Sequence, residues 1–479
     1  MSDSAAPVKL FEKKERIFPK RVWGKYRKIK WMVMAITLAI YYLAPFLRWD
    51  RGPHAPDQAI LIDMPARRAY FFFIEIWPQE VYYLTGILIL AAVALFFVTS
   101  LFGRVWCGYA CPQTVWTDLF VWVERIVQGD RAARMRLKKA PWSFDKLWKM
   151  AVTHSLWLLI GLLTGGAWVF YFNDAPTLIE HILHLDVPMS ALGWIIALTF
   201  STYLMAGFAR EQVCTYMCPY SRFQSAMFDK DTLIITYDED RGEPRGKHKK
   251  GESWEGRGHC IDCTACVQVC PMGIDIRDGL QMECIACGLC VDACNNIMDK
   301  VELPRGLIRY DTTHNQDQRR AGEVEKTVQT HILRPRTFWY MTILSVVGLV
   351  MLVSLVNRAP VELHALHDRN PLYVTLSDGT VRNGYNVKVL NKTYEDKYFR
   401  LHVEGLDGAS VRAQGAGNVQ IDHLHVFADS VGHFRVFVTA PKQNKAREDF
   451  RFVLEEVVTD GAEAGEQAVY DTHFASRSQ

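Results

Sequence analysis

Residues 260–294 read CIDCTACVQVCPMGIDIRDGLQMECIACGLCVDAC. The stretch contains the spacing C-x2-C-x2-C-x3-C twice, and the thirteen residues 271–283 separate the two runs. Three closely spaced thiolates can wrap one cubane iron cluster, while a fourth, held away by a turn, reaches the neighbouring cluster. The doubled spacing therefore predicts two [4Fe-4S] clusters. A pair of zinc knuckles explains it less well, because zinc sites do not require this doubling.

The same rule assigns ligands to each cluster, since the last cysteine of one run joins the first three of the other. Asn295 stands where a proline is expected after the eighth cysteine, but this departure removes no ligand. Two adjacent one-electron carriers can pass electrons from one to the other, but this does not identify the substrate. The predicted ligands are Cys260, Cys263, Cys266 and Cys294 for the first cluster, and Cys284, Cys287, Cys290 and Cys270 for the second.

Composition places these motifs in a membrane protein with soluble parts. The chain has 479 residues, of which 49% are hydrophobic and 22% charged, so it is too long for one core and too apolar for disorder. A formal charge of +3 gives no reason to expect a nucleic-acid partner. All 12 cysteines fall in three short stretches, a distribution that fits metal or redox motifs and not a disulfide framework.

Five segments are apolar enough and long enough to cross a bilayer core of about 30 Å. We expect residues 70–77 to form an interfacial lead into the second of these spans. The five spans contain no Asp, Glu, Lys or Arg and a single histidine, His154. A hydrogen bond between helices explains a histidine at this position better than metal binding does. The predicted spans are 31–47, 81–102, 151–172, 190–208 and 338–356.

Lysines and arginines in the connecting loops predict the direction of the spans, because positive residues are retained in the cytoplasm. Residues 1–30 carry ten of them, the next three loops four, eight and none. The N-terminus is therefore expected in the cytoplasm. The protein itself is expected in the inner membrane of a bacterium. The predicted organisation is a basic N-terminus (1–30), a four-helix membrane core (31–208), a cytoplasmic two-cluster α+β domain (209–337), a fifth span (338–356) and a periplasmic domain (357–479).

A second cysteine motif, C-x-Y-x-C-P, follows the second span and again the fourth. It supplies Cys107 and Cys111 in one copy, and Cys214 and Cys218 in the other. A following proline discourages helical geometry at the second cysteine, so each pair can open toward a shared centre at the membrane edge. Three interpretations remain open: small cysteines that pack helices, a third iron–sulfur or zinc site, and a soft-metal or redox site suited to Cu(I).

The C-terminal residues change to short β-rich runs separated by turn signals. Six or seven such strands in roughly a hundred residues predict a small immunoglobulin-like β-sandwich, whose expected use is docking. The residues after Gly461 are expected to be frayed. The predicted strands are 372–376, 386–390, 399–403, 423–427, 434–439 and 450–455.

Taken together, the five spans, the paired C-x-Y-x-C-P motifs, the eight-cysteine block and the β-rich tail resemble the CcoG family, also called FixG or RdxA. The resemblance covers nearly the whole chain in order. These are accessory proteins for assembly of cbb-type cytochrome c oxidases, and the family is implicated in reducing Cu(II) to Cu(I) for copper delivery. The resemblance implies the following partners: membrane lipid, copper ions, a copper chaperone or transporter, oxidase assembly factors and an unidentified electron donor.

Carried over by position, the resemblance implies a copper-handling, catalytic site at Cys107, Cys111, Cys214 and Cys218, with electrons supplied through the eight cysteines of residues 260–294. The chain would then be a cupric reductase with two [4Fe-4S] clusters. Two alternatives stay open. One is a membrane ferredoxin of the NapH kind, thought to pass electrons from quinol to a partner reductase. The other is a non-catalytic scaffold whose tail clamps an oxidase subunit.

Overall fold

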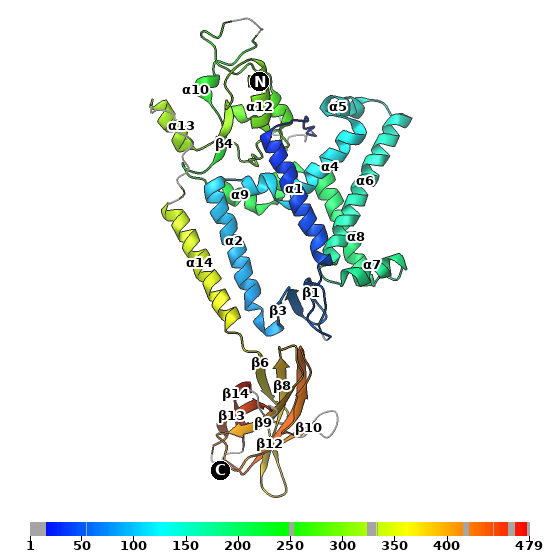
Figure 1. Ribbon diagram of the computed structural model, residues 1–479, viewed down its shortest axis with the longest axis vertical. Coiled ribbons are helices and arrows are strands. Elements are labelled where there is room, and N and C mark those ends of the chain that lie inside the picture. The colour runs from blue at the N-terminus through cyan, green and yellow to red at the C-terminus, as the bar shows by residue number, and fades with distance from the viewer. Residues whose placement is uncertain are drawn as a thin grey trace, which may run out of the picture. The chain divides into compact units, whose positions relative to one another are not determined.

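A computed structural model describes residues 16–53, 55–248, 253–322, 332, 334–414, 421–443, 445–457 and 465–476 (Figure 1). Its internal contacts divide the chain into two compact units. The first comprises Met1–Leu47 with Gln58–Met351, and the second Arg48–Asp57 with Leu352–Gln479. The cysteine motifs all belong to the first unit, whereas the second contains the β-rich tail.

The described residues contain five helices that are long and apolar enough to cross a membrane, which confirms that part of the prediction. The first begins well before residue 31 and so includes Arg27 and Lys30, whose charges are accommodated because both lie near Asp118. The five helices are α1 (Lys25–Leu43), α2 (Tyr82–Phe102), α6 (Phe144–Val169), α8 (Met189–Leu204) and α14 (Pro335–Val356).

Short helices follow the second and fourth of these helices and bear the C-x-Y-x-C-P motifs. Helix α4 packs on α6, where Phe120 stacks on Trp157 with ring centroids 5.2 Å apart. Two π-helical turns, η3 (Met205–Ala209) and η4 (Val213–Met217), follow α8. The other short helices are η1 (Ala44–Phe46), η2 (Pro78–Glu80), α3 (Val105–Tyr109), α4 (Pro112–Gln128), α5 (Arg131–Lys139), α7 (Ala175–Leu183) and α9 (Pro219–Ala226).

Residues 70–77, for which the sequence predicts an interfacial lead into the second span, form β-structure ahead of α2; their interfacial position stays a prediction. They belong to a three-stranded antiparallel sheet of β1 (Ile60–Asp63), β2 (Arg68–Phe71) and β3 (Ile74–Ile76). The turns between the strands are tight, and both Arg67 and Phe72 have positive φ. The buried Glu75 that interrupts the apolar run is paired with Arg68, 3.0 Å away, on the adjacent strand. An ion pair between adjacent strands thus accounts for the buried charge of Glu75.

The eight-cysteine segment lies in a small α+β region. Its only regular sheet within the described residues is the antiparallel pair β4 (Ile234–Tyr237) and β5 (Ile308–Asp311). Asp292 accepts hydrogen bonds from the backbone N–H groups of Tyr26 (3.2 Å) and Arg27 (2.8 Å), which fixes this region to the first turn of α1. The helices are α10 (Glu239–Gly242), α11 (Ala265–Val269), η5 (Ile276–Asp278), α12 (Leu289–Lys300) and α13 (Thr313–Arg320).

The second unit is a two-sheet sandwich, as predicted, with a core of inward-facing residues such as Tyr385, Phe399 and Phe452. One sheet has the order β10-β12-β8-β6, with β7 also on β8; the other has the order β11-β9-β13-β14. The strands are β6 (Val361–His367), β7 (Val374–Thr375), β8 (Val381–Asn391), β9 (Lys397–Glu404), β10 (Ser410–Gln414), β11 (Leu424–Val426), β12 (Ser430–Ala440), β13 (Arg447–Glu456) and β14 (Gln467–Ala475).

Two expectations for this unit are wrong. Regular β structure begins at Val361, before the first predicted strand at residue 372, and the segment expected to be frayed contains β14. Strand β14 pairs with β13 along nine residues, from Gln467 opposite Glu455 to Ala475 opposite Arg447. Most of its side chains are partly or fully exposed, but Phe474 is fully buried in the sandwich core.

Candidate functional site: two groups of cysteines in contact

The two cysteine runs of residues 260–294 adopt the same backbone conformation. In each run the residues two and four positions after the first cysteine have positive φ: Asp262 and Thr264 in one, Ala286 and Gly288 in the other. Each run then enters a helix, α11 or α12. Left-handed residues turn the chain sharply, so each loop curls and directs its cysteines inward. The sequence repeat is therefore also a structural repeat.

The structure brings the last cysteine of each run beside the other run. Cys294 interacts electrostatically with Cys266, Cys263 and Cys260. Cys270 does so with Cys287 and Cys284 of the second run. One cavity is lined by five thiols and by isoleucines from four positions, including Ile235 and Ile285. The grouping is that of the crossed rule, although the assignment of ligands to each cluster remains a prediction.

The residues present fit two iron–sulfur clusters. Thiolates in an apolar, nearly enclosed cavity are the donor set that such clusters require. Burial raises the pKa of Cys266, Cys270 and Cys294 to about 12 each, so the thiols carry protons near neutral pH until a metal displaces them. Loading of the clusters is therefore coupled to release of those protons.

The four remaining cysteines, Cys107, Cys111, Cys214 and Cys218, are called the helix-end cysteines below. Cys111 and Cys218 are the N-cap residues of α4 and α9, and each precedes a proline at the first helical position. Both have extended backbone, as the following proline predicts. Cys107 lies in α3 and Cys214 in the π-helical turn η4.

The structure brings the helix-end cysteines together. Cys214 interacts electrostatically with Cys111, Cys107 and Cys218. Burial, followed by the neighbouring Cys111, raises the pKa of Cys107 to about 11, and the same two causes raise that of Cys214 to about 12. Cys107 also donates a hydrogen bond to Gln224 Oε1 at 3.3 Å. Among the described residues, however, no three His, Cys, Asp or Glu side chains converge closely enough to hold a single metal ion.

The first helix-end motif packs directly on the loop of the second cysteine run. A Cβ atom added at Gly108 would lie 2.6 Å from the carbonyl oxygen of Ile285, 2.9 Å from that of Ala286 and 3.0 Å from Cys287 Cα. Cys107 packs against the apolar cluster that contains Ile285 and Cys287. Only glycine permits this approach, so position 108 fixes how closely the two groups of cysteines meet.

Two tyrosines reinforce the same contact from the side. Tyr109, next to Gly108, lies 3.3 Å from Tyr310 between their hydroxyl oxygens. Tyr310 in turn donates a hydrogen bond of 2.6 Å to the carbonyl of Ala286. In the first copy of the motif C-x-Y-x-C-P the tyrosine therefore holds the cluster loop, a role that sequence reasoning did not assign.

Arg104 is a further functional residue that sequence reasoning missed. It is buried, with 4% of its surface exposed, at the junction between α2 and α3. Its guanidinium donates hydrogen bonds to the backbone carbonyls of Met282, Cys284 (3.4 Å) and Ser221. An arginine also precedes the second motif, at Arg210, and this repetition is the signal that could have drawn attention to both.

Arg210 has a different environment from Arg104. It donates to Glu124 on α4 at 2.6 and 3.2 Å, and Glu124 also pairs with Arg134 and, at 2.7 Å, with Arg16. Burial raises the pKa of the Glu124 carboxyl, but these arginines outweigh it and lower the pKa overall. The carboxylate therefore stays ionised and holds η3, α4 and α5 together.

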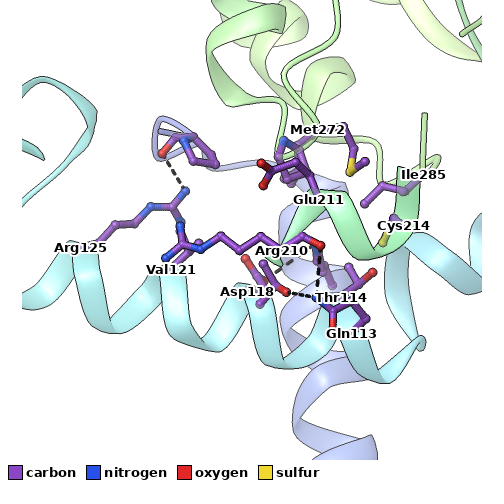
Figure 2. A pocket seen from close by; sticks show the side chains of 15 residues that line it. Gln113, Thr114, Asp118, Val121, Arg125, Arg210, Glu211, Cys214, Met272 and Ile285 are labelled. Carbon is purple, nitrogen blue, oxygen red and sulfur yellow. Dashed lines mark hydrogen bonds and ion pairs between the residues drawn. The ribbon is translucent and has the colours of Figure 1, made fainter. Parts of the chain in front are cut away.

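A pocket opens beside Cys214 on the side of α4. Figure 2 shows Cys214, Met272 and Ile285 at one end of this pocket and Arg125 and Val121 at the other. Met272 and Ile285 also line the thiol cavity of the second cysteine run, so these two side chains separate the pocket from that cavity.

His154 is not part of the pocket lining. Its Nδ1 lies 3.0 Å from the Tyr203 hydroxyl, which is the interhelical hydrogen bond that the sequence favours.

Comparison with protein families identifies three parts of the chain. The family described as "4Fe-4S dicluster domain" matches residues 209–313, and "4Fe-4S binding domain" matches residues 84–129, which include Cys107 and Cys111. A third, an "IG-like fold at C-terminal of FixG", matches residues 351–477. Two 4Fe-4S binding domains are therefore present in the chain.

Similar proteins match along the whole chain or part of it. The nitrogen fixation protein FixG of Rhizobium meliloti is 48% identical over 97% of this chain and 93% of its own. RdxB of Cereibacter sphaeroides is 50% identical over 98% of each. The ferredoxin-type protein NapH of Haemophilus influenzae is 24% identical over 43% of this chain and 65% of its own.

One solved structure, a FixG-related protein from Vibrio parahaemolyticus, covers 25% of this chain and 97% of its own. It has 23% sequence identity and a TM-score of 0.20.

Proposed function

Because this chain belongs to the family of FixG, RdxA and RdxB, and is a membrane iron–sulfur oxidoreductase by its domains, we propose that it reduces Cu(II) to Cu(I) for assembly of a cbb-type oxidase. The substrate is the copper ion, which accepts one electron. When bound, the two [4Fe-4S] clusters supply electrons one at a time. The helix-end cysteines are the place where copper is bound and reduced.

The contact between Gly108 and the loop at Ile285–Cys287 is the observation that carries this proposal. It joins a set of soft thiol ligands to a one-electron source, with only packed side chains and backbone between them. Thiolates favour Cu(I) over Cu(II), so binding at these cysteines makes reduction of the ion more favourable. Burial raises the pKa of Cys107 overall and outweighs Arg104, which lowers it, so this thiol gives up its proton when the metal binds.

The helix-end cysteines do not form a ready-made site for one ion in the described structure. Copper reduction is compatible with this, because a transient substrate has to leave as well as bind. We propose that Cu(I) is held by a subset of the four and then passed to a copper chaperone or transporter. We also propose the sidedness predicted from the loop charges: both cysteine groups in the cytoplasm and the sandwich in the periplasm.

Paired serine variants test the assignment. Cys107→Ser with Cys214→Ser should abolish Cu(II) reduction and Cu(I) binding, while the visible charge-transfer absorbance of the clusters is kept. Cys263→Ser with Cys287→Ser should bleach that absorbance and stop turnover. Copper reduction at the wild-type rate in the first variant would refute the site. Copper binding without reduction in the wild type would favour the scaffold role.

A NapH-like activity is the second candidate, and the partial match to NapH favours it. In that case quinol would deliver electrons to the chain and a partner reductase would take them away. The "4Fe-4S binding domain" match at residues 84–129 covers Cys107 and Cys111, which favours an electron-carrying role for these two cysteines. Rapid reduction by a quinol analogue, together with reoxidation that Cu(II) does not accelerate, would support it. Iron and sulfide in excess of two clusters, lost in Cys107→Ser, would assign a third cluster to the helix-end cysteines.

A further inference from the structure

Arg104 is a buried positive charge that has no carboxylate partner among the described residues. Its side chain is almost completely buried, yet every hydrogen-bond acceptor it has among the described residues is a neutral backbone carbonyl. No carboxylate within the described chain forms an ion pair with it. A buried arginine without an opposite charge is strongly disfavoured, because its desolvation is not compensated.

The contrast with other buried arginines of the same unit makes this clear. Arg210, which precedes the second C-x-Y-x-C-P motif, pairs with Glu124 at 2.6 Å. Arg27 pairs with Asp118 at 2.8 Å, and Arg277, beside the first cysteine run, pairs with Asp275 and Asp262 at 2.6 Å each. These arginines have carboxylate partners, whereas the surroundings of Arg104 offer thiols.

The acceptors of Arg104 show which thiols matter. Met282 and Cys284 belong to the loop of the second cysteine run, and Ser221 follows Cys218 in α9. The guanidinium interacts electrostatically with Cys284, Cys107 and Cys214, which come from both groups of cysteines. One cation thus lies between the second cluster site and the helix-end cysteines.

We propose that Arg104 is the counter-charge of the second iron–sulfur cluster and raises the affinity of that cluster for an electron. A cluster with four thiolates is anionic, and reduction adds one more negative charge without a proton. A fixed cation in a poorly solvated interior therefore stabilises the reduced form more than the oxidised form. The electron therefore resides on the second cluster, and not on the first, before it leaves toward the helix-end cysteines.

This inference rests on the cluster assignment and not on copper as the acceptor, so it can fail or hold independently of the proposed function. Arg104 acts as a positioning residue, since its hydrogen bonds also tie the cluster loop to α9. The test must therefore separate its charge from its hydrogen bonds. Arg104→Lys keeps the charge and loses the planar fork, whereas Arg104→Gln keeps hydrogen-bond donors and loses the charge.

The experiment is an anaerobic redox titration of the full-length protein, monitored by electron paramagnetic resonance. The signal lost in Cys287→Ser identifies the second cluster. Arg104→Gln should lower the electron affinity of that cluster at least tenfold, a midpoint about 59 mV more negative for a one-electron couple. Arg104→Lys should stay within about threefold of the wild type, and the matched control Arg277→Gln should leave the second cluster unchanged.

Three results would overturn the proposal: unchanged midpoints in Arg104→Gln, equal shifts in Arg104→Gln and Arg104→Lys, or a shift of both clusters together. If Arg104→Gln fails to load its second cluster, iron and sulfide analysis decides the matter. Loss of half of the iron in Arg104→Gln, with full iron in Arg104→Lys, supports a requirement for charge. Loss in both variants contradicts it and leaves Arg104 a purely structural tie.

Discussion

Substitution of Gly108 by alanine tests whether the contact between the two groups of cysteines controls electron transfer. The added methyl group would lie 2.6 Å from the carbonyl oxygen of Ile285, where ordinary contact begins at 3.4 Å, so this oxygen must withdraw by about 0.8 Å. Two further backbone atoms, at 2.9 and 3.0 Å, also lie too close. Backbone cannot rotate away as a flexible side chain can, so the cluster loop itself has to move.

The energetic sign follows from two opposing effects. Alanine gains up to about 1 kcal/mol over glycine in a helix, whereas overpacking of a tight contact costs about 1–3 kcal/mol. Three close backbone contacts put this site at the upper end of that cost, so the contact should loosen. A misplacement of about 1 Å can cost up to about a hundredfold in rate, and we expect copper-driven reoxidation to slow by about tenfold.

The assay mixes anaerobically reduced protein with Cu(II) and follows the recovery of cluster absorbance in a stopped-flow instrument. Gly193→Ala is the matched control, because a methyl group there meets no atom within 4 Å. The control should reoxidise at the wild-type rate with the same cluster content. Gly108→Ala that is fully loaded and reoxidises as fast as the control would refute the role of the contact.

Two further predictions concern the ion pairs and the thiols. Asp118→Asn should destabilise the first unit by about 3–5 kcal/mol, because it leaves the buried Arg27, 2.8 Å away, without its counter-charge; thermal unfolding in detergent measures this, and the control Asp130→Asn, which removes a surface carboxylate that accepts a hydrogen bond from the backbone N–H of Arg21, should change little. Equal losses in both variants would contradict the assignment. The pKa values of about 11 for Cys107 and about 12 for Cys214 mean that both thiols are protonated at neutral pH. Cu(I) binding must then release protons, and the apparent affinity should rise about tenfold per pH unit for each proton released. Competition with a Cu(I) chelator at two pH values measures it, and an affinity independent of pH would be incompatible with thiolate ligation.

Local chemistry made much of the fold predictable. The five apolar helices follow from composition alone, and the extended backbone at Cys111 and Cys218 follows from the proline after each. The crossed proximity of Cys270 and Cys294 follows from a spacing that occurs twice. In the first two cases the determining residues lie within a few positions of the feature; in the third, the repeated spacing itself indicates the long-range contact.

Features that depend on distant partners were not predictable. The π-helical turn that contains Cys214 has no sequence signature, and the burial of Glu75 depends on an ion pair with Arg68 on the adjacent strand. Strand β14 has a single fully buried residue, Phe474, and is recognisable only from its pairing with β13. Gly108 and Arg104 are ordinary residues in the sequence; their importance comes from a loop about 180 positions away, which single-sequence reasoning cannot bring near them.

The most direct test of the central claim is a count of electrons between the clusters and copper. Anaerobically purified, reduced protein is mixed with Cu(II), and Cu(I) is quantified with a specific chelator while cluster reoxidation is followed in the same sample. We predict one Cu(I) for each electron that leaves the clusters, and no Cu(I) once the clusters are oxidised. Clusters that remain reduced in the presence of Cu(II), or Cu(I) that forms without cluster oxidation, would contradict the account.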